Sequence, residues 1–225
     1  MIGIFDSGVG GLCSLTELCR LMPYENVIYL ADRENAPYGI RSRSELIGLC
    51  NRSIGRLIDY GAELVLMACC TASTVHSYLD PRYREISIPI IAPTAAVAAK
   101  YSRVAVIGTA ATVRSRAFSR QIGRISDSLV KEFAHQELVG HIEGGCRDGN
   151  ITESCLACLI KIREQVRSFG ADALILGCTH FTHLIGELSA LLPEVAMISP
   201  AHVGAMEIYQ RAKDKEKENG RLTYT

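Results

Sequence analysis

The segment ALILGCTHFTHL (173–184) is a short apolar run that stops at a glycine and then presents Cys178 beside a threonine and a histidine. A second segment, ELVLMACCTAST (63–74), has nearly the same form, with Cys69 close to a threonine at the end of its apolar run. An apolar run of this length predicts a buried β-strand. Two strands that both end in cysteine and threonine indicate a related pair of sites.

Short apolar runs alternate with longer amphipathic segments along most of the chain. Between several of the runs, segments such as 44–62 and 153–171 carry apolar residues three and four positions apart, as helices do. The alternation predicts an α/β fold with mostly parallel strands flanked by helices, in which ligands bind at the carboxyl ends of the strands. The predicted strands are residues 2–5, 26–31, 64–69, 88–93, 103–109, 138–143, 173–178 and 195–199.

The second half of the sequence loosely repeats the first. IGIFDS (2–7) corresponds to VAVIGT (104–109), since each is a predicted buried strand followed by a residue with a hydroxyl group. LVLMACCT (64–71) corresponds in the same way to LILGCTH (174–180). The repeat predicts two similar α/β domains that face each other, with the site in the cleft between them.

A domain boundary is expected near Pro93, where two prolines flank a short strand before an alanine-rich helix. We therefore expect a first domain at residues 1–92 and a second at 93–204, with residues 205–225 packing back on the first.

Composition narrows the class of protein. The 225 residues include 24 basic and 24 acidic side chains, so there is no excess positive charge to bind nucleic acid or an anionic membrane. No run of about twenty apolar residues predicts a membrane span, and the first residues do not resemble a secretion signal. Nine cysteines in a chain of this length favour a reducing cytoplasm, with the thiols free.

Two thiols on opposite sides of a cleft suggest acid–base chemistry. A thiolate on one side of a substrate carbon can take its proton while a thiol on the other side gives one back, which inverts the carbon. Cys69 and Cys178 alone lie at equivalent strand ends beside threonine, whereas Cys13, Cys19 and Cys50 are expected to be structural.

Five sequence blocks resemble, in order and spacing, the cofactor-independent glutamate racemases of bacterial cell-wall synthesis, within the aspartate/glutamate racemase superfamily. The resemblance runs from residue 2 to about residue 199. The blocks are DSGVGGL (6–12), Asp32 followed by PYG (37–39), ACCTAS (68–73), VIGTAATVRS (106–115) and GCTHF (177–181).

The resemblance implies roles for individual residues. Cys69 would act on D-glutamate and Cys178 on L-glutamate, with Asp6 and His180 as the polar partners that tune the thiols and Glu143 as a further acidic group near the second thiol. It implies an amino-acid substrate and no cofactor or metal, and because members of that family often dimerise, a homodimer is a candidate assembly. The implied substrate contacts are Asp6, Ser7, Tyr38, Gly39, Cys70, Thr71, Thr179 and His180.

The chain departs from the family pattern at Cys70, where the pattern has asparagine. A thiol is a weak hydrogen-bonding group, and an unsatisfied partner costs about 1–3 kcal/mol. We therefore expect Cys70→Asn to raise activity on glutamate. Two other functions stay open: a racemase of aspartate or of broad specificity, against which His180 argues, and a non-catalytic homologue that binds a small ligand.

We expect structural rather than catalytic roles for the other motifs. The pair Cys155 and Cys158 resembles half of a zinc site, but it falls in a helical pattern without a second such pair. The glycines at 8–11 match no nucleotide-binding motif and are expected to allow a tight turn close to a small carboxylate ligand. We expect core or surface roles for the remaining histidines, His76, His135, His183 and His202.

Overall fold

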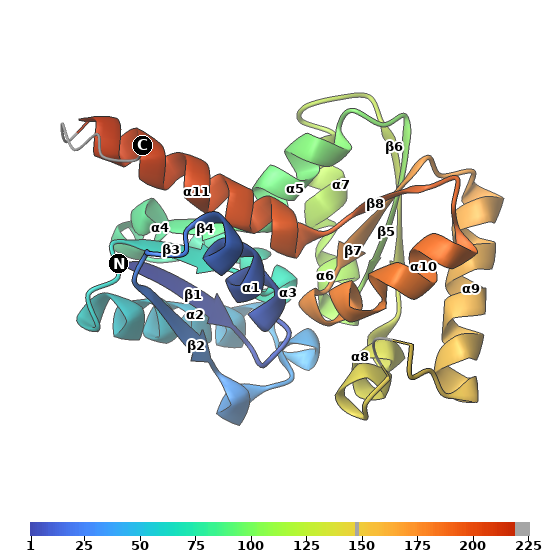
Figure 1. The fold of residues 1–225 in the computed structure, drawn as a ribbon, viewed down its shortest axis with the longest axis horizontal. Coiled ribbons are helices and arrows are strands. Elements are labelled where there is room, and N and C mark those ends of the chain that lie inside the picture. The colour runs from blue at the N-terminus through green and yellow to red at the C-terminus, as the bar shows by residue number, and fades with distance from the viewer. Residues whose placement is uncertain (147–148, 219–225) are drawn as a thin grey trace.

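Each half of the chain forms a four-stranded parallel sheet in the computed structural model, which describes residues 1–146 and 149–218 (Figure 1). The strand orders are β2-β1-β3-β4 and β6-β5-β7-β8, so the two halves share one topology and confirm the predicted α/β fold. The strands are β1 (Ile2–Asp6), β2 (Val27–Ala31), β3 (Leu64–Met67), β4 (Ser87–Pro89), β5 (Arg103–Gly108), β6 (Leu129–Ala134), β7 (Ala173–Gly177) and β8 (Ala196–Ile198).

Helices flank both sheets (Figure 1). Two of them have clear sequence signals at their first residues: Ser42 and Glu45 form a reciprocal capping box at the start of α2, and Thr152 caps α9. The α-helices are α1 (Leu12–Leu21), α2 (Arg43–Asp59), α3 (Cys70–Ser73), α4 (Pro81–Ile86), α5 (Ile91–Ala98), α6 (Ala110–Ser115), α7 (Ala117–Ile122), α8 (Gln136–Glu143), α9 (Glu153–Phe169), α10 (Ile185–Leu191) and α11 (Pro200–Glu218), with 3-10 helices η1 (Arg33–Asn35), η2 (Tyr38–Ile40), η3 (His76–Tyr78) and η4 (Thr179–Leu184).

One predicted strand is wrong. Residues 138–143 belong to α8, where Leu138, Val139 and Ile142 are buried on one face of the helix. The strand at this place in the fold is β6, an edge strand whose residues are partly or fully exposed and which therefore has no apolar run. The predicted strand at 88–93 is also too long, because β4 ends at Pro89 and α5 begins at Ile91.

The register of the sheets brings functional groups to one edge. In the first sheet β1 lies between β2 and β3, with Phe5 paired to Met67, so Asp6 and Cys69 emerge at neighbouring strand ends. In the second sheet Gly108 pairs with Gly177, which puts Thr109 beside Cys178 in the same way. These pairings agree with the repeat seen in the sequence.

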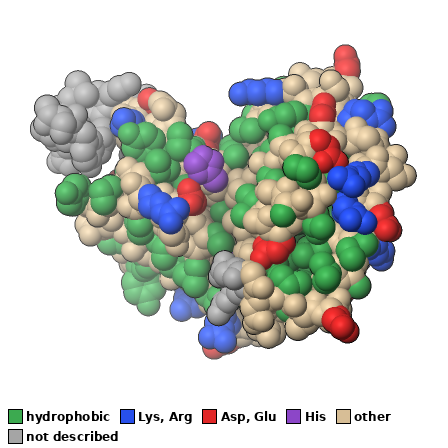
Figure 2. Space-filling model, turned by 45° about the vertical axis from the view of Figure 1, so that its right-hand side comes forward, with side chains coloured by type: hydrophobic (Ala, Val, Ile, Leu, Met, Phe, Trp, Pro, Cys, Tyr) green, Lys and Arg blue, Asp and Glu red, His purple; other side chains and the backbone are tan. Residues whose placement is uncertain are grey.

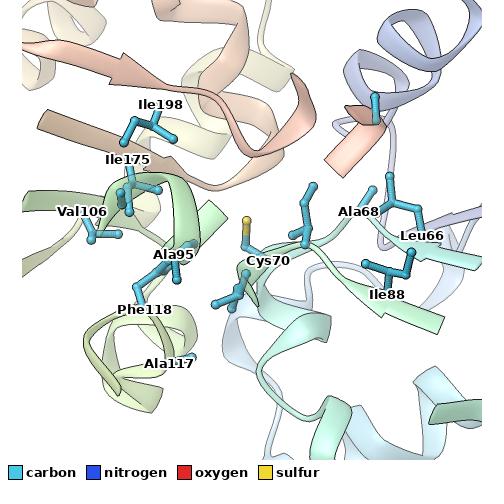
Figure 3. Close-up of a cluster of buried hydrophobic side chains, with 14 of the residues drawn as sticks. Leu66, Ala68, Cys70, Ile88, Ala95, Val106, Ala117, Phe118, Ile175 and Ile198 are labelled. Atoms are coloured by element: carbon cyan, nitrogen blue, oxygen red, sulfur yellow. The ribbon is translucent and has the colours of Figure 1, made fainter. Parts of the chain in front are cut away.

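Three apolar clusters hold the layers together. One lies under α2 in the first half, and another lies among α8, α9 and α10 in the second. The third spans both halves: Figure 3 shows Leu66 and Ile88 on one side and Val106 and Ile175 on the other, with Cys70 between them. Each such side chain stabilises the fold by about 1.5–3 kcal/mol on burial, so the two halves share a core.

The last helix, α11, runs from the second half back along the first (Figure 1) and packs against α1 and α5. Residues 219–225, the end of the segment expected to pack on the first half, lie outside the described residues. No helix in the described ranges is both long enough and apolar enough to cross a bilayer. Figure 2 shows a notch between the two lobes of the molecule.

Candidate active site

A cavity of about 40 Å³ lies where the strand ends of the two halves meet. Since one water needs about 10–15 Å³ by this measure, the cavity has room for roughly three waters. Apart from Asp6, every predicted site residue lines it: Ser7, Tyr38, Gly39, Cys69, Cys70 and Thr71 from the first half, and Glu143, Cys178, Thr179 and His180 from the second.

The Cys69 thiol stands at the start of α3, directly after β3. Its Sγ lies 3.4 Å from Oγ of Ser7 and accepts a hydrogen bond of 3.5 Å from the backbone N–H of Ala72. Burial raises the pKa of Cys69 to about 11, the nearby Asp6 adds to the rise, and the contacts with Ser7 and Ala72 oppose it. The thiol is therefore protonated at neutral pH.

The second thiol, Cys178, follows β7 and precedes η4. Its Sγ lies 3.7 Å from Nδ1 of His180, whose Nε2 lies 3.2 Å from a carboxylate oxygen of Glu143. Burial raises the pKa of Cys178 far above its ordinary value, so this thiol is also protonated at neutral pH. The imidazole is nearly buried and the Glu143 carboxylate is more than half exposed. The three groups, thiol, imidazole and carboxylate, therefore form a row that leads from the cavity towards solvent.

Asp6 is fully buried and lies behind the cavity wall. Its carboxylate accepts hydrogen bonds from the backbone N–H of Gly8 (2.8 Å) and from Oγ1 of Thr179 (3.2 Å). The bond to Thr179 joins the two halves. Burial raises the pKa of Asp6, while these bonds and the neighbouring His180 oppose the rise. In the described part of the chain, Asp6 is thus placed to position cavity residues and does not itself line the cavity.

Cys70 belongs both to the cavity wall and to the apolar cluster between the halves (Figure 3). Its side chain is 2% exposed, and burial raises the pKa of its thiol well above the ordinary value. The thiol thus packs as a small apolar group at a position where the family pattern has an amide.

Three threonine hydroxyls form a closed triangle across the cleft. Oγ1 of Thr71 lies 3.0 Å from Oγ1 of Thr109 and 3.1 Å from Oγ1 of Thr112, and those two lie 2.9 Å apart. Tyr38 is held differently, because its phenol donates a 2.6 Å hydrogen bond to Asp32. The phenol of Tyr38 is therefore already engaged in this state.

Sequence reasoning missed several cavity residues. Thr109 follows β5 as Ser7 follows β1, so the repeat pointed to a hydroxyl there without assigning it a role. Gln136 and Val139 both lie on α8: Val139 falls in the segment 138–143, which the sequence predicts as a strand, and Gln136, just before that segment, has no sequence signal. Ala36 also lines the cavity, as do Gly8 and Pro37, which belong to two of the sequence blocks above.

Two glycines allow the halves to approach closely. A Cβ at Gly10 would stand 2.5 Å from Oγ1 of Thr179 and 2.8 Å from Nδ1 of His180. A Cβ at Gly39 would stand 2.6 Å from Oε1 of Gln136. Both glycines belong to the first half and all three neighbours to the second, so larger side chains would hold the cleft open.

No group of three or more histidine, cysteine, aspartate or glutamate side chains within 1–146 and 149–218 is arranged to hold a metal ion. The CxxC pair lies on α9, with Cys155 buried and Cys158 partly buried.

The sequence and the structure are similar to those of known racemases. The family model described as Asp/Glu/Hydantoin racemase matches residues 14–208. A glutamate racemase of Desulforudis audaxviator is 36% identical over 206 residues, which is 89% of this chain and 74% of that protein.

Two solved structures extend the likeness to the fold. Glutamate racemase of Francisella tularensis, solved with D-glutamate, has a TM-score of 0.85 and 28% identity over 100% of this chain and 83% of its own. The enzyme of Thermus thermophilus, solved with beta-chloro-D-alanine, has a TM-score of 0.79 and 31% identity over the same shares. With its two parallel sheets and a cysteine from each at one cavity, the chain belongs to the Asp/Glu/hydantoin racemase family.

Proposed function

We propose that this chain interconverts L- and D-glutamate by proton transfer at the α carbon, with Cys69 and Cys178 as the two acid–base groups. The observation that carries the proposal is that both thiols line one cavity, one from each half of the chain. A carbon held between them can lose a proton on one face and gain one on the other. The substrate follows from the relatives, which are named glutamate racemases.

In the proposed reaction, Cys69 takes the proton from D-glutamate while Cys178 protonates the opposite face, and the roles reverse for L-glutamate. Only a thiolate can accept the proton, and burial keeps both thiols protonated at neutral pH. The ammonium group of a bound amino acid favours the charged form of a thiol close to it, so substrate binding itself promotes ionisation.

The neighbouring side chains have supporting roles in this proposal. His180 lies between Cys178 and Glu143 and exchanges a proton with the Cys178 thiol. Ser7 has the corresponding place beside the Cys69 thiol. Asp6 holds the loop after β1 and Thr179 in register. Thr71, Thr179 and the backbone at Gly39 are the proposed contacts to the carboxylates and the ammonium group.

Substrate exchange requires the halves to separate, because a cavity of about 40 Å³ does not hold glutamate. For this motion we propose the division into residues 1–92 with 205–225 and residues 93–204. The D-glutamate formed would supply peptidoglycan synthesis.

Isotope exchange tests the proposal. The protein is incubated with L-glutamate, and separately with L-aspartate, in deuterated water, and loss of the α proton and of optical rotation is followed. Exchange and racemisation of glutamate alone support the proposal. Exchange of aspartate points to a racemase of other or broad specificity, and exchange of neither points to a binding protein without catalysis.

Single variants test the two thiols. Cys69→Ala and Cys178→Ala should each abolish full racemisation, while Cys19→Ala, which removes an exposed thiol on α1, should leave it unchanged. Robust racemisation by either cavity variant would remove the mechanism with two thiols, even if glutamate proves to be the substrate.

A further inference from the structure

A second thiol–imidazole pair lies outside the cavity, on a different surface of the cleft. Sγ of Cys13, on α1, lies 3.6 Å from Nε2 of His183, on η4, so the pair bridges the two halves. Both side chains are partly exposed. Neither residue lines the candidate active site in the described part of the chain, and the sequence suggested only structural or surface roles for them.

Cys13 opens onto a groove of about 770 Å³ between α1, α10 and the start of α11. This volume lies within the range of small-molecule sites. The groove wall carries both charges: Glu17 accepts from Arg20 at 3.1 Å and lies 2.9 Å from Nδ1 of His202. Such a wall suits a zwitterionic ligand that has both carboxylate and ammonium groups.

The chemistry of the pair is that of an activated thiol. In the tautomer with its proton on Nδ1, the His183 ring accepts the thiol proton at Nε2, and a thiolate is the reactive form of cysteine. A free thiol is only a few per cent ionised at neutral pH, and a partner that raises this fraction to about half speeds disulfide exchange about threefold, because the larger thiolate fraction outweighs the lower nucleophilicity of the thiolate.

We propose that Cys13 is a site of reversible covalent modification by small zwitterionic disulfides of the glutathione type. The Cys13 thiolate attacks one sulfur of the disulfide, a new S–S bond forms to Cys13, and the original S–S bond breaks. The departing thiolate takes the proton held by His183. The sulfur of Cys13 is oxidised and the departing sulfur is reduced, so the exchange balances without a further reagent.

The test uses glutathione disulfide as the probe, with mass mapping of each modified cysteine over time. Cys19 is the internal control, because it is exposed on the same helix. Cys13 should be modified first, about threefold faster than Cys19, and dithiothreitol should reverse the modification. Modification of Cys19 at an equal or higher rate would overturn the proposal, and this comparison needs no variant.

A variant tests the imidazole. His183→Gln should slow modification of Cys13 about threefold and leave the rate at Cys19 unchanged. An unchanged rate at Cys13 would overturn the role of His183. Modification of the buried Cys50 or Cys155 would reveal that the variant unfolds. In that case the proposal is decided by the rates at Cys13 and Cys19 in the protein without the substitution.

Discussion

Burial governs the protonation of both cavity thiols. At Cys69 and Cys178 the cost of placing a charge in a poorly solvated cavity outweighs the hydrogen bonds that favour the thiolate. In the proposed reaction, the thiols therefore become bases only when a bound ligand brings compensating charge. The narrow cavity would in this way control the ionisation of both thiols.

The pKa of Cys69 predicts how its alkylation depends on pH. Iodoacetamide reacts with the thiolate, whose fraction rises about tenfold per pH unit below the pKa, so the rate at Cys69 should climb steadily towards pH 11 in the ligand-free protein. Free cysteine, which titrates near about 8.5, is the control and should level off earlier. Mass mapping of Cys69 measures the rate, and a plateau below pH 9 would contradict the raised pKa.

The substitution Cys70→Asn should act on activity and stability in opposite directions. An amide at the cavity wall provides a stronger hydrogen-bonding group, so kcat/KM for glutamate should rise. The same amide would lie in the apolar cluster between the halves, and incomplete satisfaction there should lower the free energy of unfolding by about 1–3 kcal/mol. Kinetics and urea unfolding measure the two effects. An unchanged or lower kcat/KM would refute the assignment of Cys70 as a substrate contact.

Among the elements, the strands predicted correctly are those whose sequence contains an apolar run, including the partly exposed edge strands β2 and β8. Both central strands, β1 and β5, and their neighbours β3 and β7 are buried along nearly their whole length. The edge strand β6 has no such run, and the apolar face of α8 was mistaken for it. Short apolar segments do not distinguish a strand from one face of a helix.

The difficulty of telling a strand from one face of a helix also limits how much of the site could be predicted from the sequence. Cys69 and Cys178 stand out because they end buried strands, and Thr109 is hinted at by the repeat. Gln136 reaches the cavity only through the misassigned helix α8. That Asp6 stands behind the wall could not be foreseen, because it depends on how the loops after β1 and β7 pack against each other.

The close approach of the loop after β1 to η4 predicts the effect of Gly10→Ala. The added Cβ would clash with Thr179 and His180 and displace them. Misplacement of catalytic groups by about 1 Å can cost about 10²-fold in rate, so kcat/KM should fall by that order. Gly186→Ala is the matched control, since nothing lies within 4 Å of its Cβ and alanine suits its position in α10. Equal activity of the two variants would show that closure at Gly10 is unnecessary.

For the whole molecule, the shared apolar cluster and the bond between Asp6 and Thr179 join two sheets that part to admit a ligand in the proposed function. The cluster includes Cys70 of the cavity wall (Figure 3), and a hinge at the cluster would keep much of the core packed while the strand ends separate. Opening should therefore expose the segments at the cleft more than the outer helices.

Hydrogen exchange tests this motion. Adding D-glutamate should slow exchange at α3 and η4, because a ligand that contacts both walls of the cleft draws the two halves together and opposes wider opening. At a concentration of about 100 times Kd the slowing should approach a hundredfold at amides that exchange through this opening. Helix α9, on the outer face of the second half, is the control and should change little. Equal slowing in α9 would indicate general stabilisation, and no slowing at α3 or η4 would mean that the ligand enters without separation of the halves.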